Sequence, residues 1–284
     1  MRVPNELIAP QVAVALKEDF GQGDIHDSIV DSQQHSEAII LSRHDGILCG
    51  QDWVNETCRQ TDPSITTNWF VPEGALIEPD QVVLELSGPS YLLLRIERTM
   101  LNFLQLLTGT ATRTKEFVSR IAHTKAKVLD TRKTIPGWRT AQKYAVEIGG
   151  GENHRFGLWD AFLLKENHIN AAGGIRRAIQ RARNAEPDVF LEIEVETLRE
   201  LHDALQGRPD RIMLDNFTIE DTKHAVDLVR KYHKDHGIEI ELEASGQINL
   251  ENIVEVAETG VDYISLGTLT KDVKAHDFSL QLKK

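Results

Sequence analysis

The chain has 284 residues, of which 40% are hydrophobic and 27% charged, and its formal net charge is -12. This length suits one large domain or two, and the acidic balance argues against a general binder of nucleic acids or anionic membranes. Two cysteines, Cys49 and Cys58, support neither a disulfide framework nor a zinc cluster. The N-terminus does not resemble a signal peptide, and no stretch approaches the roughly 20 apolar residues of a membrane helix. We therefore expect a cytoplasmic protein with no membrane partner.

The first part of the chain, up to about residue 108, mixes short elements. Residues 37–49 predict a β-hairpin that turns at Asp45-Gly46. Residues 69–86 place Pro-Glu-Gly and Glu-Pro-Asp turns between short apolar runs, which favours strands. From Tyr91 to about His123 apolar residues recur three and four apart, which predicts a helix with a stop at Thr108-Gly109.

From Lys127 onward the pattern alternates regularly between strands and helices. The predicted strands are 127–130, 161–164, 190–195, 211–214, 238–244 and 261–266, and the predicted helices are 139–148, 174–185, 198–205, 219–232 and 250–258. Such alternation is typical of parallel strands with covering helices. Six repeats without a GxGxxG motif favour a (β/α) barrel, complete or not, over an open dinucleotide-binding sheet.

Each predicted strand of this second part runs from apolar residues into a charged, hydroxyl or glycine residue. In chain order these endings are Asp130-Thr131-Arg132-Lys133, Lys165, Glu194, Asp215, Ser245-Gly246 and Gly267-Thr268. The reacting groups of a (β/α) barrel project from this end, so the endings outline a site. Helix starts expected near Asn249 and beyond Thr268 favour phosphate binding at the last two endings, although glycines also serve tight turns.

Positive charge is concentrated between residues 132 and 165, a segment that contains six Lys or Arg residues and only three acidic residues in an otherwise acidic chain. This concentration suggests a pocket for a small anion. A glycine loop at 148–153 delivers His154 and Arg155, and an Arg fork pairs well with a carboxylate, although such a loop is also typical of a plain linker. His154 and His168 lack metal-ligand spacing, and we interpret His168 as a structural residue.

Two acidic runs share single strand faces. Glu192, Glu194 and Glu196 alternate with apolar residues, and so do Glu239, Glu241 and Glu243. Inside a barrel such carboxylates need cations or a metal, and Arg132, Lys133 and Lys165 would supply part of that charge. We expect an unusually polar barrel interior.

At these residues the sequence resembles the quinolinate phosphoribosyltransferases over essentially its whole length. The specific motifs are Leu129-Asp-Thr-Arg-Lys-Thr-Ile-Pro-Gly-Trp-Arg, Gln142-Lys-Tyr-Ala-Val, Gly149-Gly-Gly-Glu-Asn-His-Arg, Leu164-Lys-Glu-Asn-His-Ile, Glu192-Ile-Glu-Val-Glu, Met213-Leu-Asp-Asn-Phe, Glu243-Ala-Ser-Gly and Gly260-Val-Asp-Tyr-Ile-Ser-Leu-Gly. In the first part, Glu97-Arg-Thr-Met-Leu-Asn-Phe-Leu and Glu18-Asp-Phe-Gly-Gln-Gly-Asp fit the same family. The resemblance implies a transferase of NAD biosynthesis that converts quinolinate and phosphoribosyl pyrophosphate to nicotinate mononucleotide, pyrophosphate and CO2.

The resemblance also implies a fold and an assembly. The fold is of the α/β class, with an N-terminal α/β sandwich domain over residues 1–108 and an open (β/α) barrel of about seven strands over 109–271. The tail, 272–284, would pack back on the first domain. Such enzymes form homodimers, or assemblies of dimers, in which the neighbouring subunit completes each active site.

The resemblance implies functional roles for the residues of this chain that match the family's motifs. Substrate binding falls to Arg98 of the neighbouring subunit and to Arg132, Lys133, His154, Arg155 and Lys165, and phosphate binding to Ser245, Gly246, Gly267 and Lys271. Lys165, Glu194 and Asp215 would be catalytic, with Glu194 and Asp215 also serving Mg2+, the implied cofactor. Two positions depart from the pattern: Lys271 stands where certain relatives have histidine, and Gln247 where glycine is common.

Two other readings of the residues stay open. Lys165 at a strand end would suit a barrel lyase or aldolase that forms a Schiff base, although neighbouring acids would keep its ammonium protonated. A related branch of the family accompanies molybdate transport, and such a protein would keep the fold while binding another ligand. The full set of cations and acids at the strand ends argues against this loss of the catalytic site.

Overall fold

The computed structural model describes residues 3–283, and they form two compact units. The first unit contains the chain up to residue 115, residues 134–150 and the chain from 268 on. The second contains residues 116–133 and 151–267. The chain therefore passes more than once between the units, and the predicted domain boundary at 108/109 stays a prediction.

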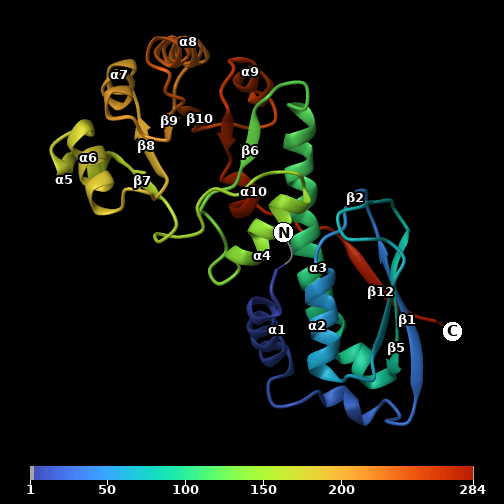
Figure 1. The fold of residues 1–284 in the computed structure, drawn as a ribbon. Helices are drawn as coiled ribbons and strands as arrows, with labels where there is room; N and C mark the ends of the chain where they lie inside the picture. Colours follow the sequence, from blue (N-terminus) through green and yellow to red (C-terminus); the bar gives the residue numbers. More distant parts are fainter. Residues whose placement is uncertain (1–2, 284) are drawn as a thin grey trace. The chain divides into compact units, whose positions relative to one another are not determined.

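The first unit is an α/β sandwich built on a four-stranded antiparallel sheet in the order β12-β1-β5-β3. Its elements are α1 (Asn5–Phe20), a 3-10 helix (Ile25–Ser28), β1 (His35–Ser42), β2 (Gly46–Ile47), α2 (Gln51–Thr61), β3 (Thr66–Trp69), β4 (Leu76–Ile77), β5 (Val82–Pro89), α3 (Ser90–Arg120), α4 (Arg139–Ile148), α10 (Thr268–Lys271) and β12 (Phe278–Leu282). Helices α2 and α3 cover one face of the sheet (Figure 1). The core between them includes Ile40, Leu84, Trp53 and Phe103, all fully or almost fully buried. β12 pairs with β1, so the end of the chain lies in this sheet.

The predicted hairpin over residues 37–49 is wrong. β1 does not turn back on β2; it pairs with β5 on one side and β12 on the other, while β2 pairs with β4. Because both edges of β1 are filled by strands from distant parts of the chain, its backbone groups need no local partner. The Asp45-Gly46 signal reports only the local bend.

The predicted stop of the long helix at Thr108-Gly109 is also wrong, because α3 continues through both residues to Arg120. Gly109 serves a different purpose. A Cβ atom there would lie 2.2 Å from the carbonyl oxygen of Lys274, so only glycine lets the C-terminal segment approach the helix. The glycine marks a close backbone contact rather than a helix end.

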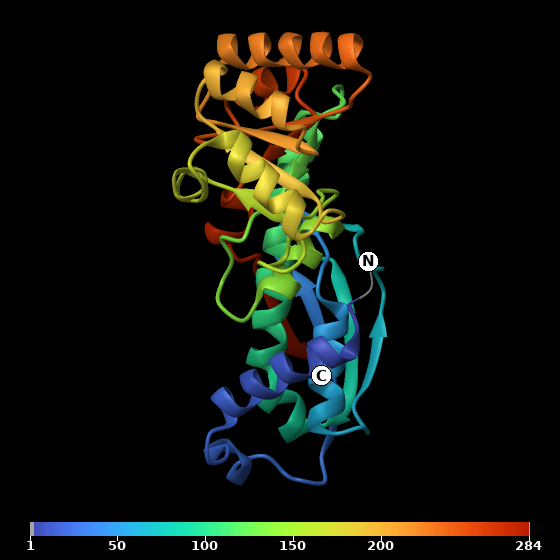
Figure 2. The ribbon, with the colours of Figure 1, turned by 60° about the vertical axis from the view of Figure 1, so that its left-hand side comes forward.

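The second unit is a sheet of six parallel strands in the order β6-β11-β10-β9-β8-β7, with helices on its outer face (Figures 1 and 2). Its elements are β6 (Lys127–Leu129), β7 (Phe162–Leu164), α5 (Glu166–Ala172), α6 (Ile175–Ala185), β8 (Leu191–Val195), α7 (Leu198–Gly207), β9 (Arg211–Asp215), α8 (Ile219–His236), β10 (Glu241–Ser245), α9 (Ile253–Glu258) and β11 (Tyr263–Ser265). β6 and β7 stand at the two ends of the sheet, which makes the barrel open. An isolated parallel bridge between Leu129 and Glu152 stands where a seventh strand would extend β6 outward.

The six predicted strands and five predicted helices of this part all exist, and their ends agree to within three residues except at the end of α8, which runs four residues further. One shift matters for the site. α9 begins at Ile253, not near Asn249, because the side chains of Asn249 and Asn252 hold the backbone N–H groups of Glu251 and Asn249 in a turn. Those N–H groups are therefore already used. Among the described residues no helix has the length and apolar character needed to cross a membrane.

Candidate functional site

A cavity of about 150 Å³ lies at the carboxyl ends of the strands of the second unit. Its lining comes from the loops after β6 and before β7, from the residue after β7 and from four strands: Thr131, Arg132, Lys133, His154, Arg155, Leu163, Lys165, Met213, Glu243, Ser245 and Ser265. Arg132, Arg155 and Lys165 thus face one space, as the sequence predicts. Burial lowers the pKa of the Arg155 guanidinium, and the positive charge of nearby Arg132 lowers it further. Several fixed positive charges in one small cavity suit a multiply charged anion.

Lys165 and Glu194 form an ion pair at one side of this site. Lys165 follows β7 directly, and Glu194 lies on β8, so the parallel pairing of these strands brings them together. Glu194 is only 12% exposed, whereas Lys165 is 47% exposed and so is open to a ligand. This pairing occupies the Lys165 ammonium, which disfavours a role as a nucleophile.

Asp215 ends β9, and its register partner on β10 is Ser245. The side-chain amide of Asn216 donates to Asp215 Oδ2 at 2.9 Å, and the Asn216 backbone N–H donates to the Ser245 carbonyl at 2.9 Å. Lys133 reaches the last strand ending, because a Cβ on Gly267 would lie 3.0 Å from its Cδ. The endings of β6, β9, β10 and β11 therefore meet at this end of the sheet.

The Ser245-Gly246-Gln247 turn depends on backbone conformations that favour glycine. Gly246 has φ +102°, and a Cβ there would lie 2.2 Å from Asn216 Oδ1. Gln247 also lies in the left-handed region, at φ 49°. Gln247 thus keeps a positive φ at the position where glycine is common in the family. Because Gln247 has a side chain, this conformation is less favourable for it than for glycine.

Gly246→Ala is expected to lower the free energy of unfolding by about 1–3 kcal/mol, because the new methyl group meets both an unfavourable φ and the Asn216 side chain. Gly237→Ala is the matched control, since Gly237 has φ +68° with nothing within 4 Å of its Cβ position. The control should cost less than Gly246→Ala, about 1 kcal/mol, because only the conformational part applies to it. Urea unfolding measures both, and equal losses would contradict the close approach of Asn216.

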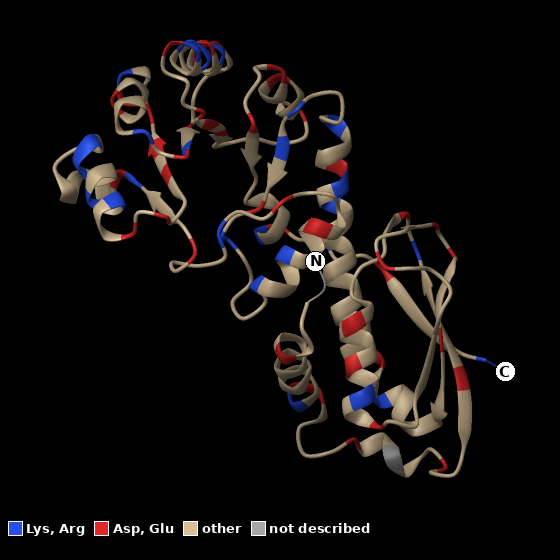
Figure 3. Cartoon of the chain, viewed as in Figure 1, with Lys and Arg blue, Asp and Glu red and all other residues tan. Residues whose placement is uncertain are grey.

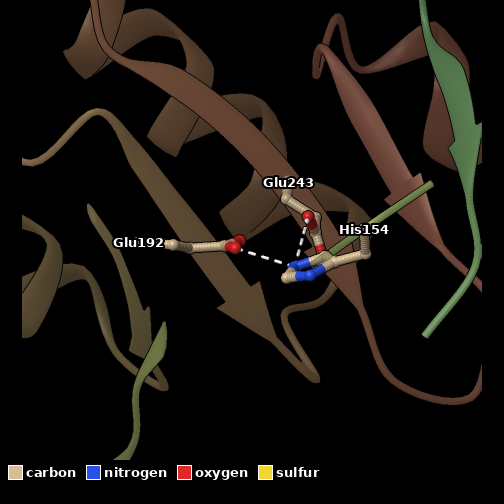
Figure 4. A group of neighbouring side chains, drawn as sticks. All are labelled: His154, Glu192 and Glu243. Atoms are coloured by element: carbon tan, nitrogen blue, oxygen red, sulfur yellow. Dashed lines mark ion pairs between the residues drawn. The ribbon is translucent and has the colours of Figure 1, made fainter. Parts of the chain in front are cut away.

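His154 lines the cavity from a buried position between two carboxylates (Figure 4). Its Nε2 lies 2.7 Å from Oε2 of Glu192 and 3.6 Å from Oε2 of Glu243. Burial raises the pKa of Glu192 to about 7, and burial together with Glu192 raises the pKa of Glu243 to about 8. Both shifts favour the protonated, uncharged form of these buried carboxyl groups.

Arg211 supplies the nearest fixed cation to these acids. Its Nη1 lies 3.4 Å from Glu243 Oε2 and its Nη2 lies 2.8 Å from Glu241 Oε2. Although burial opposes it, the charges of Glu192 and Glu243 raise the pKa of Arg211. Acidic residues do lie on β8 and β10, as the alternating pattern predicts (Figure 3). Glu192 and Glu243 are buried, as a polar interior requires, whereas Glu241 is partly exposed and Glu196 and Glu239 lie outside the strands.

Two groups offer ligands of the kind that bind metals. His154, Glu192 and Glu243 place three ligand atoms within 4.8 Å of one another, but Nε2 and Oε2 of Glu192 are at hydrogen-bond distance and Arg211 already brings positive charge. Glu194 and Asp215 offer carboxylate oxygens at the cavity end of the sheet, the donors that Mg2+ prefers. Both members of the second group are carboxylates, the ligand type that Mg2+ prefers, whereas the first group includes an imidazole nitrogen.

Several lining residues were not predicted from the sequence. Leu163, Met213 and Ser265 line the cavity, and Arg211 forms an ion pair with Glu243, an acidic residue of the lining. Alternation along β9 is a signal that would have found two of them, because Arg211 and Met213 share the face of Asp215. The two remaining predicted residues belong to the first unit: Arg98 is exposed on α3, and Lys271 ends α10 beside Asp272, 3.3 Å away.

Comparisons with known proteins place the chain in a family. Residues 24–108 match the model of the quinolinate phosphoribosyl transferase N-terminal domain, and residues 110–281 match that of its C-terminal domain. A probable nicotinate-nucleotide pyrophosphorylase (carboxylating) of Bacillus subtilis is 40% identical over 266 residues, covering 93% of this chain and 90% of the relative. The structure of the nicotinate-nucleotide pyrophosphorylase from Francisella tularensis superposes with a TM-score of 0.94 at 44% identity, covering 99% of this chain and 98% of the other. The chain belongs to the quinolinate phosphoribosyl transferase family.

Proposed function

We propose that the protein is a decarboxylating quinolinate phosphoribosyltransferase of NAD biosynthesis. It transfers the phosphoribosyl group of phosphoribosyl pyrophosphate to quinolinate and forms nicotinate mononucleotide, pyrophosphate and CO2. The observation that supports this most directly is the single cavity that Arg132, Arg155 and Lys165 line together. Quinolinate carries two carboxylates on one pyridine ring, so it needs several cations fixed around a small volume.

Binding orients the ring for the first step. Arg132 and Arg155 pair with the carboxylates, and Lys165 adds a point charge, with Lys133 nearby. The ring nitrogen attacks C1 of the ribose, and the C1–oxygen bond to pyrophosphate breaks. Leu163 and Met213 contribute apolar surface to the same cavity, which suits the uncharged faces of the ring.

The departing pyrophosphate needs its charge neutralised. Ser245, Gly246, Gly267 and Lys271 would hold phosphate groups, and Glu194 and Asp215 would hold the ribose hydroxyls or Mg2+. When bound, Mg2+ supplies a positive charge for the phosphate oxygens. Lys165 and Glu194 stay paired, so the protein works by position and charge and forms no covalent intermediate.

Loss of CO2 follows from the product of the first step. Once its nitrogen carries the ribose, the ring is cationic and stabilises the electron pair left on C2 when the adjacent carboxylate departs. A proton from solvent then adds to C2 in place of CO2. The protein's contribution is to hold the other carboxylate in a small cavity.

The active unit in this proposal is a homodimer, located in the cytoplasm. Arg98 of the neighbouring subunit would complete the cavity by adding a further cation for quinolinate. The exposure of Arg98 on α3 is compatible with this role.

Incubation of the protein with quinolinate, phosphoribosyl pyrophosphate and Mg2+ tests the proposal. We expect nicotinate mononucleotide, pyrophosphate and CO2 in equal amounts, detected by chromatography and by release of label from the 2-carboxylate. Nicotinate in place of quinolinate is the control for the second carboxylate and should react poorly. Binding of another anion without any turnover of quinolinate would favour the non-catalytic reading instead.

A further inference from the structure

A buried series of polar contacts runs through the second unit from β9 toward the cavity. Arg211 donates from Nε and Nη2 to Oε2 of Glu241, at 3.0 and 2.8 Å, and its Nη1 lies 3.4 Å from Oε2 of Glu243. The guanidinium also lies 3.9 Å from the centre of the Tyr263 ring. Contacts from two neighbouring strands thus fix its position.

His154 is the next member of the series. Its Nδ1 lies 2.8 Å from the backbone nitrogen of Arg155, and a backbone N–H only donates. Nδ1 is therefore the acceptor and carries no proton, so the ring proton lies on Nε2, facing Glu192 at 2.7 Å. With Nδ1 unprotonated the imidazole is neutral and adds no charge to the cavity.

We propose that Arg211 is a positioning residue for the reaction, an inference that rests on the proposed function. Through Glu243 and Glu192 it holds the ring of His154 in the Nε2–H form, and His154 in turn fixes the backbone at Arg155. Arg155 then points its guanidinium into the cavity, where Nη1 also donates to the Ala161 carbonyl at 3.3 Å. His154 thereby acts on quinolinate through Arg155.

Arg155 has a physical need for such an anchor. It is partly buried beside Arg132, and two guanidinium groups that share a small cavity repel each other in the absence of substrate. A carboxylate placed between them relieves the repulsion only if both forks already point correctly. A fixed backbone at Arg155 therefore lowers the cost of orienting its side chain when quinolinate binds.

Steady-state kinetics of Arg211→Met test the proposal, with Arg176→Met as the matched control. Arg176 is also paired with a carboxylate, Asp203 at 2.8 Å, but lies on the exposed side of α6. Arg211→Met should raise KM for quinolinate on the order of 10- to 100-fold, with KM for phosphoribosyl pyrophosphate changed less than about twofold. Arg211→Lys should recover part of the loss, and the control should behave as wild type. An equal rise in both KM values, or none in a folded variant, would overturn the proposal.

A spectroscopic measurement separates this inference from the proposed function. The 15N shifts of His154, assigned with His154→Gln, should show a protonated Nε2 and an unprotonated Nδ1 in wild type and lose this pattern in Arg211→Met. An imidazolium, or a metal-bound ring that responds to a chelator, would overturn it. If wild type fails to convert quinolinate, the proposed function fails, while the tautomer result stands independently.

Arg211→Met leaves buried carboxylates without their cation and so risks unfolding. The double variant Arg211→Met/Glu243→Gln removes one negative charge together with the cation and keeps the volume of residue 243. Its 15N pattern and KM for quinolinate should change as in the single variant. A wild-type pattern and wild-type KM in this folded double variant would also overturn the proposal.

Discussion

Arg98→Ala is expected to reduce kcat/KM roughly 100-fold or more, because it removes one cation that the proposed dimer brings to quinolinate. Arg132→Ala should be similarly inactive, since Arg132 lines the cavity. Mixed and allowed to exchange subunits, the two inactive variants should recover about one quarter of wild-type activity. Half of the dimers formed are then hybrids, and one of the two sites in each hybrid has both arginines.

The complementation needs two controls. Arg120→Ala, which removes another exposed arginine of α3, should keep wild-type activity. Mass spectrometry of differently labelled subunits should confirm that exchange has taken place. If exchange is complete and no activity returns, each site is built from a single chain and the role proposed for Arg98 is wrong.

Lys165→Met should lower kcat on the order of 100- to 1,000-fold, because it removes a positive charge from the reacting groups and leaves Glu194 without its partner. Lys165→Arg should retain more activity than Lys165→Met, since it preserves the charge. The thermal unfolding midpoint should be measured for each variant to separate loss of folding from loss of catalysis.

Lys127→Met is the matched control for this change. Lys127 is the first residue of β6 and so lies at the end of this strand that is away from the cavity. It also pairs with a carboxylate, Glu152, at 2.7 Å. It should keep near-wild-type kcat. Borohydride treatment in the presence of carbonyl substrates should trap no adduct on wild-type Lys165, and a trapped adduct would favour the Schiff-base reading over phosphoribosyl transfer.

The second unit follows closely from local sequence signals. Its strands are short apolar runs that end in polar residues, and its helices have apolar residues at helical spacing, so each element is specified by neighbouring residues. In parallel strands the carboxyl ends meet at one edge of the sheet. That rule is sufficient to predict that Arg132 and Lys165 face one cavity, as observed, whereas Arg155 reaches the same cavity from the loop before β7.

Local signals failed where distant backbone segments meet. β1 pairs with strands that begin at Val82 and Phe278, and nothing near residues 35–42 specifies those partners. Gly109 looks like a helix stop because its actual cause, the carbonyl of Lys274, lies 165 residues further along the chain. In both cases the missing information was the identity of a long-range partner.

The sequence by itself determined the family, the order of elements in the second unit and the set of charged residues at its strand ends. Only the tertiary structure decided how those charges are paired: Lys165 with Glu194, His154 with Glu192, and Arg211 with Glu241 and Glu243. The reason is that alternation along a strand tells which face a side chain occupies, whereas its partner depends on the register of neighbouring strands and on burial. Arg211 illustrates the difference, because its position on β9 is evident from the sequence and its role among buried acids is not.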